Sequence, residues 1–493
     1  MKANRFFQIA AAVGLLAVNA GAADPQLTIY NQNFAVVRVL IPLDLKPGEN
    51  RIQFTDTTAY LEPESVILRD PTGARTLQIL EQNYRADPVS QQLLLSLYEG
   101  KTLDFLLQPN DPKSVVRGKV IRSGYISPRV GYSGAMQEPI IEVDGQLRFG
   151  LPGSPVFPAL IGDTILKPTL NWVLQSDRPG EVNAEFSYVT GQITWNADYN
   201  LVAPEKGDQL DLVGWVTVNN QTGKTFDNAR IKLMAGNVNK IQPPMNGRFI
   251  MGMAQAVAVD GMFGGVPPQV SEKSFEEYHL YELHRPTTLN DQESKQVEFV
   301  RAAGIKSERF YVYDGVKINP NQYHGWNMES IRQNGEYGTE SNPDVAVMRE
   351  FANSEANHLG MPLPAGRLRF YRRDTDSQLE FAGENDIKHT PRDETVRVYT
   401  GDAFDIKGER RRTDYRSDMA RRMLDESFEI KLRNHKREPV EVRVVEHLYR
   451  GANWEITEKS STYLKTDSQT MEFRVQVPPD SEKVVTYTAH YTW

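Results

Sequence analysis

The stretch Phe428-Glu429-Ile430-Lys431-Leu432-Arg433 decides the fold class, because apolar and charged residues alternate along it without a break. A period of two is typical of a β-strand that has one buried face and one wet face. The same alternation recurs on both sides, at residues 440–444 and 473–477 near the C-terminus and at residues 210–218 further upstream. Turn-forming runs such as Asn219-Asn220-Gln221-Thr222-Gly223 separate these segments. Many short strands joined by such turns predict β-sandwiches.

The pattern therefore predicts a mainly β, multidomain, antiparallel β-sandwich-like architecture with few short helices. Residues 91–98 and 417–425 are the best candidates for those helices. Two long flexible insertions are expected, a Met-, Gly- and Ala-rich one near 241–272 and an Asn- and Gly-rich one near 319–343.

Composition shifts predict the domain boundaries. A β-rich domain is expected over residues 24–160, because this stretch ends in a Gly- and Pro-rich passage at 149–155. A second β region is expected over 165–493, with possible halves at 165–340 and 345–493.

Composition also excludes several function classes. The chain has 493 residues, a net charge of -8 and no cysteine. A net negative charge argues against a nucleic-acid partner, which requires a basic face. Without cysteine there are no disulfides, no thiolate metal sites and no thiol nucleophile.

The N-terminus has the three parts of a secretory signal peptide over residues 1–22. Lys2 and Arg5 precede an apolar stretch, and Ala20-Gly21-Ala22 fits the small-residue cleavage pattern. We therefore expect a mature chain that begins at Ala23 and is exported to the periplasm or the cell surface. No later stretch is long and apolar enough for a transmembrane helix after signal cleavage.

Several motifs in the C-terminal two thirds resemble exported bacterial proteins of unknown function that are related to the mucoidy inhibitor family. They are YVTGQITWNADY (188–199), NARIKLMAGNVN (228–239), YELHRPTTL (281–289), NWEI (453–456) and YTAHYTW (487–493). The resemblance covers about residues 165–493. It implies an all-β envelope protein and no activity or catalytic residue.

Signals for catalysis are weak, and the sequence predicts no cofactor. The best polar cluster holds Asp386 and His389, three residues apart. A carboxylate and an imidazole at this spacing could hold a divalent metal in a metal-assisted hydrolase. The competing interpretation is a β-turn at Asn385 and Asp386.

Residues 407–422 carry more arginine and lysine than carboxylate, which is unusual in an acidic chain. One interpretation is a surface that binds anionic envelope polymers through Arg410, Arg411, Arg412 and Arg416, since guanidinium pairs well with carboxylate and phosphate. The other is an ordinary solvated face.

Alternation up to the terminal aromatic residue, at Val485, Tyr487, Ala489, Tyr491 and Trp493, leaves two structures open. It is typical of a sandwich strand and also of the closing strand of an outer-membrane β-barrel. The short strands elsewhere favour the sandwich. We therefore expect a binding or scaffolding protein rather than an enzyme, with an envelope polysaccharide or another envelope protein as its partner.

Overall fold

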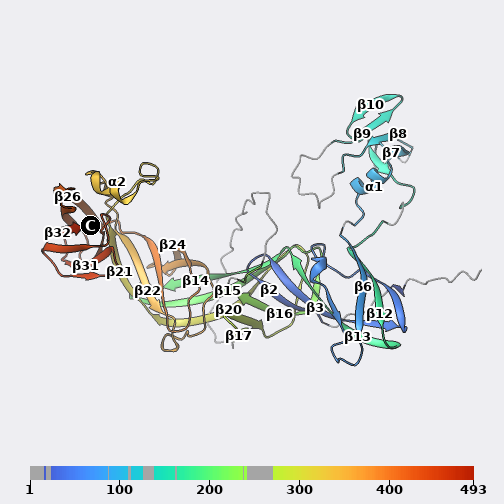
Figure 1. Ribbon diagram of the computed structural model, residues 1–493, viewed down its shortest axis with the longest axis horizontal. Helices are drawn as coiled ribbons and strands as arrows, with labels where there is room; N and C mark the ends of the chain where they lie inside the picture. The colour runs from blue at the N-terminus through green and yellow to red at the C-terminus, as the bar shows by residue number, and fades with distance from the viewer. Residues whose placement is uncertain are drawn as a thin grey trace, which may run out of the picture. The chain divides into compact units, whose positions relative to one another are not determined.

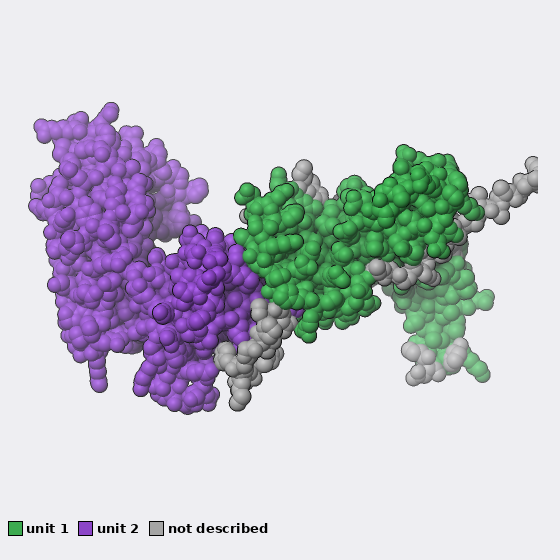
Figure 2. All heavy atoms as spheres, turned by 90° about the horizontal axis from the view of Figure 1, so that it is seen from below, with its two compact units in different colours: residues 1–195, 217–296 green, residues 196–216, 297–493 purple. Residues whose placement is uncertain are grey.

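The computed structural model describes residues 16–17, 24–86, 88–108, 111, 113–125, 138–160, 164–236, 238–240 and 270–493. The mainly β prediction is confirmed, because strands dominate the described residues (Figure 1). The chain forms two compact units, residues 1–195 with 217–296 and residues 196–216 with 297–493 (Figure 2). The predicted domain boundaries stay predictions. No helix in the described ranges has the length and apolar character needed to cross a membrane.

The first unit contains three sheets. An eight-stranded sheet holds β17 (Val270–Phe275), β18 (Tyr278–Leu283), β16 (Phe226–Ala235), β2 (Gln26–Tyr30), β3 (Phe34–Leu45), β13 (Gly180–Gly191) and β5 (Ile67–Arg69), with β19 (Thr287–Leu289) paired to β16. A four-stranded sheet has the order β1 (Leu16–Ala17), β4 (Gly48–Phe54), β12 (Thr169–Ser176) and β6 (Leu77–Arg85). A five-stranded sheet has the order β10 (Gln146–Phe149), β9 (Ile140–Val143), β8 (Val115–Arg122), β7 (Thr102–Leu106) and β11 (Ser154–Val156).

The described residues of this unit include two short helices. The 3-10 helix η1 covers Pro63–Ser65. The helix expected at residues 91–98 is confirmed as α1 (Gln91–Leu97), which begins where the side chain of Ser90 accepts a hydrogen bond from the Leu93 amide.

The second unit contains the greater part of a five-stranded sheet and two further sheets. The first has the order β20 (Glu293–Lys306), β15 (Gln209–Asn220), β14 (Ile193–Ala203), β23 (Gly366–Arg373) and β24 (Leu379–Ile387). A six-stranded sheet has the order β25 (Thr395–Asp402), β22 (Ala346–Ala352), β21 (Glu308–Asp314), β28 (Val440–His447), β31 (Thr470–Val477) and β30 (Tyr463–Lys465). A four-stranded sheet has the order β26 (Ile406–Asp418), β27 (Met423–Asn434), β32 (Ser481–Thr492) and β29 (Trp454–Lys459). The helices are η2 (Glu355–Asn357) and α2 (Met328–Gln333).

The six-stranded and four-stranded sheets of this unit share one apolar core and form a β-sandwich, which we call the C-terminal sandwich. Phe428, Ile430 and Leu432 of β27 are buried in that core, while the charged residues between them face away. The C-terminal alternation has the same cause, because the alternate apolar residues of β32 are buried in the same core. Most neighbouring strands are antiparallel, but β21 and β28 are parallel.

One local prediction fails in this sandwich. Residues 417–425 are not a helix: β26 and β27 pair up to Asp418 and Met423, and a turn with Arg422 at φ 54° joins them. The charged residues that suggested a helix face are strand and turn residues.

The flexible insertions stay predictions. The segment 319–343 contains α2, and hydrogen bonds connect it to the sandwich. Of the insertion expected near 241–272, residues 241–269 lie outside the described residues, and residues 270–272 begin β17.

Candidate functional site

A buried ion pair lies inside the C-terminal sandwich. Arg410 of β26 donates from Nε to both carboxylate oxygens of Glu446 in β28, at 2.9 and 3.0 Å. Their side chains are 2% and 0% exposed. Tyr487 donates its hydroxyl to the same carboxylate, and the guanidinium of Arg410 lies 3.9 Å from the ring centre of Phe428. Burial lowers the pKa of Arg410, but the charges of Glu446 and Tyr487 and the hydrogen bonds with these groups together raise it above the ordinary value.

A second buried carboxylate accompanies the first. Glu426 of β27 accepts a hydrogen bond at 2.8 Å from Arg450 and lies 3.5 Å from a guanidinium nitrogen of Arg412. Three buried or nearly buried cations therefore face two buried carboxylates. Such an arrangement is tolerated only where the remaining guanidinium protons also find acceptors.

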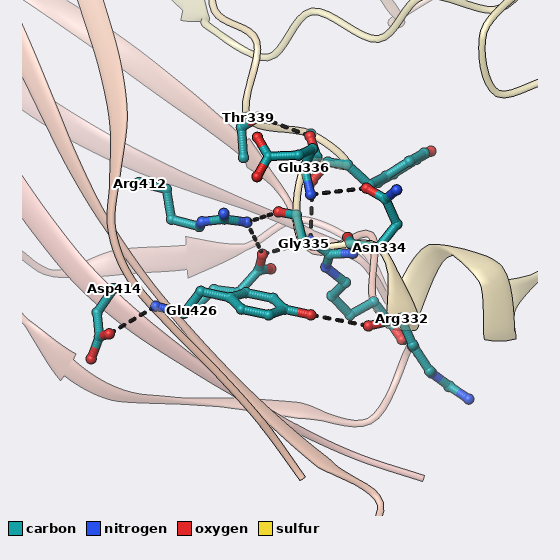
Figure 3. Close-up of polar contacts among 12 residues, drawn as sticks. Arg332, Asn334, Gly335, Glu336, Thr339, Arg412, Asp414 and Glu426 are labelled. Carbon is teal, nitrogen blue, oxygen red and sulfur yellow. Dashed lines mark hydrogen bonds and ion pairs between the residues drawn. The ribbon is translucent and has the colours of Figure 1, made fainter. Parts of the chain in front are cut away.

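The backbone of residues 331–338 supplies those acceptors. Arg450 donates to three carbonyl groups, and Arg410 donates to one. Arg412 also donates to one carbonyl group, that of Gly335, as Figure 3 shows, and the hydroxyl of Tyr415 donates to another. The accepting residues are Ile331, Asn334, Tyr337, Gly335, Gly338 and Arg332. The buried charges therefore fix the shape of a surface segment, because each carbonyl has a defined donor from the sandwich.

A cluster of aromatic rings, Tyr323, Trp326, Tyr337 and Tyr449, lies on and beside this fixed segment, and we call it the aromatic platform; Tyr337 is its member within residues 331–338. Tyr323 lies 5.0 Å from Trp326 and 4.8 Å from Tyr337 between ring centres, both edge to face. Tyr337 meets Tyr449 edge to face at 5.8 Å. Trp326 is 36% exposed, and the three tyrosines are partly exposed. The platform is thus a connected apolar surface with hydroxyl groups that faces solvent.

His447 extends the platform at the end of β28. Its ring stacks on Tyr449 at 5.4 Å, and its Nε2 lies 2.9 Å from a carboxylate oxygen of Asp314. The hydrogen bond to Asp314 raises the pKa of His447, and the charges of Glu446 and Asp467 act in the same direction. Glu446 and His447 are neighbours on β28 and point to opposite faces of the strand, so only Glu446 is buried.

The arginines that the sequence grouped together are separated by the structure. Arg410 is enclosed with Glu446, so its guanidinium is not part of an exposed patch, and Arg412 is mostly buried beside Glu426. Arg411 and Arg416 are exposed, and each is paired with a carboxylate, that of Glu429 or Asp414. Binding of an anionic polymer by Arg411 and Arg416 stays a prediction.

Asp386 and His389 do not lie in a single turn. Asp386 is exposed in β24 opposite Arg367, and His389 follows the strand and accepts a hydrogen bond from the Ala365 amide at 3.1 Å. Among the described residues, no group of three or more His, Asp or Glu side chains is placed to hold a metal ion.

Sequence reasoning missed Glu426, Glu446 and Arg450, although a signal for the two glutamates existed. Glu426 lies in phase with Leu424 and Phe428, and all three side chains point inward. A carboxylate at an apolar position of an alternating strand indicates a buried ion pair, since it needs a partner there.

Comparison with known families adds one finding. A family model described as a domain of unknown function (DUF4139) matches residues 184–493. This match confirms that the C-terminal region belongs to a family without an assigned function, while the resemblance to the mucoidy inhibitor family stays a prediction. A search of curated proteins found no match.

Proposed function

Since this chain belongs to the DUF4139 family, whose name assigns no activity, we propose from its own residues that it is an exported cell-envelope protein that binds polysaccharide on the aromatic platform. One observation carries the proposal. Four rings connected through Tyr337 lie at the surface of the C-terminal sandwich, on and beside a segment fixed by buried arginines.

The chemistry of the platform suits sugars. Aromatic rings offer flat apolar area to the C–H faces of a pyranose, and tyrosine hydroxyls offer hydrogen bonds at the ring edge. Gln322 is exposed and donates its amide to the hydroxyl of Tyr323 at 3.2 Å, which leaves the amide oxygen for a ligand. Asn321 and Gln333 add further exposed amides on the same segment.

Rigidity of the segment favours binding. A loop that orders only on binding loses conformational entropy at that moment, and a preformed surface avoids this cost. Here the carbonyls of residues 331–338 are already bound to Arg410, Arg412 and Arg450.

Affinity electrophoresis tests the proposal with neutral, methyl-esterified pectin and a neutral β-glucan in the gel, together with sedimentation on peptidoglycan sacculi. We expect retention on at least one polymer, and a loss of about tenfold or more in Trp326→Ala and Tyr323→Ala, as for anchor residues of an interface. Phe404→Ala is the matched control, because Phe404 is 91% exposed and lies outside the platform. Absence of retention, or equal binding by Trp326→Ala, would contradict the proposal.

Export is proposed on the signal-peptide pattern alone. Osmotic shock of the native host should release the protein with a mass that begins at Ala23. Cleavage there would remove β1 and leave β4 paired with β12. An uncleaved mass in the cytoplasm would contradict this part.

A further inference from the structure

A second aromatic surface lies on the C-terminal sandwich where two edge strands are connected. β29 ends the four-stranded sheet, β30 ends the six-stranded sheet, and residues 460–462 join them. Trp454 of β29 and Tyr463 of β30 are partly exposed, and their ring centres lie 6.4 Å apart. The indole of Trp454 donates to the Ser468 carbonyl at 2.8 Å, which fixes its orientation.

Two exposed lysines lie over these rings. The ammonium of Lys465 is 4.4 Å from the ring centre of Trp454, and that of Lys459 is 4.8 Å from the ring centre of Tyr463. In the part of the chain that the structure describes, neither ammonium has a carboxylate within ion-pair distance. Arg411 and Arg416, by contrast, are exposed and paired. The two lysines are therefore positioned cations that keep their charge available.

This surface adjoins the aromatic platform. The turn between β30 and β31 contains Asp467, whose charge acts on His447 of the platform, and Ser468, which holds Trp454. Tyr449 precedes Trp454 by only five residues on the connection from β28 to β29. A chain-like ligand on the platform would therefore extend past this turn to the lysines.

We propose that Trp454, Tyr463, Lys459 and Lys465 form a subsite for the carboxylate-bearing sugars of a linear acidic polysaccharide. This inference rests on the proposed function and names its ligand class. The exposed part of each ring contacts the C–H groups of a sugar, and the ammonium over the ring pairs with the carboxylate of that sugar or its neighbour.

Charges nearby argue against a nucleic acid as the ligand. Glu455 and Glu458 are exposed on β29, and the whole chain has a net charge of -8. Affinity for a nucleic acid depends on neutralising many successive phosphates, and this surface offers two ammonium groups. The two ammonium groups instead pair with individual carboxylates, while the rings contact the sugars.

The test compares one polymer in two charge states, polygalacturonate and its methyl ester, by affinity electrophoresis of the full chain. The double variant Lys459→Gln/Lys465→Gln should bind polygalacturonate about tenfold more weakly, the size of a lost charge-assisted hydrogen bond, and should bind the methyl ester as wild type does. Added salt should weaken wild-type binding to polygalacturonate more than it weakens the variant. Lys388→Gln/Lys483→Gln, which removes two exposed lysines elsewhere, should behave as wild type.

The outcomes separate the two proposals. Unchanged polygalacturonate binding by the Lys459 and Lys465 variant overturns this inference, even if Trp326→Ala confirms the platform with the methyl ester. If the lysine variant loses binding to polygalacturonate and Trp326→Ala changes binding to neither polymer, the subsite is supported and the platform is contradicted. Tighter binding of poly(dT) than of polygalacturonate overturns the glycan assignment. Equal melting temperatures of all variants establish that folding is unchanged.

Discussion

Each unit of the molecule buries a glutamate on a strand, and the exposure of its arginine partners differs between the two units. In the first unit, Glu185 of β13 is 5% exposed and pairs with Arg38 and Arg69, whose side chains are 48% and 61% exposed. In the C-terminal sandwich, Glu446 is 0% exposed and its partner Arg410 is 2% exposed. The arginines of Glu185 keep most of their hydration, whereas Arg410 depends entirely on protein acceptors.

This difference shows what a buried arginine can do that an exposed one cannot. With no water to satisfy its protons, Arg410 reaches past Glu446 to the carbonyl of Gly338. Arg450 does the same with Glu426 and the carbonyls of Asn334 and Tyr337. The buried charges thus fix residues 331–338, the segment that carries Tyr337 of the aromatic platform.

Removal of the buried carboxylate should have the largest effect. Glu446→Ala leaves Arg410 charged and unpaired in the core, which should lower the free energy of unfolding by about 3–5 kcal/mol. Differential scanning calorimetry of the full chain should show one transition moved to lower temperature. The double variant Arg410→Met/Glu446→Leu should recover most of the loss, since it removes both charges. If Glu446→Ala leaves the unfolding temperature unchanged, the buried ion pair is contradicted.

The next largest loss of stability should come from Arg450→Met. Three carbonyl groups lose their donor in this variant, while Glu426 keeps Arg412 as a partner. We expect a loss of about 2–4 kcal/mol and faster amide exchange over residues 331–338. Glu-C protease should cut the chain after the exposed Glu336 in this variant and leave the same bond uncut in the wild type. The control Arg416→Met removes an exposed arginine and should change neither measurement. Exchange that stays slow in Arg450→Met would mean that the segment is held by other contacts.

The sequence predicts this region only in part, and the reason lies in which contacts are local. Alternation around Phe428 and Ile430 identifies the strands, because a period of two depends only on residues that are adjacent in the sequence. Arg410 also lies in phase with Ile406, on the inner side of β26, so its burial was detectable. The acceptors were not detectable: Gly338 precedes Arg410 by 72 positions, and no local pattern joins a strand arginine to a distant carbonyl.

Glu185→Gln should have a smaller effect than either change in the sandwich. Arg38 and Arg69 are about half exposed, so water solvates their guanidinium groups when the carboxylate is lost. The amide oxygen of glutamine still accepts a hydrogen bond. We expect a loss of about 1 kcal/mol or less, measured by the same calorimetry. Destabilisation as large as that of Glu446→Ala would show that exposure of the partner does not decide the cost.

The smallest effect should belong to His447, which pairs with Asp314 at the surface of the same strand that buries Glu446. The pKa of folded His447 is raised above the ordinary value of about 6.5, so its pair stabilises the protein fully below that pH. The contribution is lost as pH rises through the raised folded pKa. His447→Gln should therefore lower the melting temperature at pH 5.5 and have little effect at pH 8.5, with a difference worth about 1 kcal/mol or less.

His324→Gln is the control, because His324 is an exposed histidine that follows Tyr323 of the platform in the sequence. A penalty for His447→Gln that is equal at both pH values would show that packing on Tyr449, and not charge, is what the imidazole contributes. A penalty that is larger at pH 8.5 would contradict the pair with Asp314. If the penalty is confined to low pH, the loss decreases from Glu446 through Glu185 to His447 as the exposure of the replaced side chain rises from 0% through 5% to 28%.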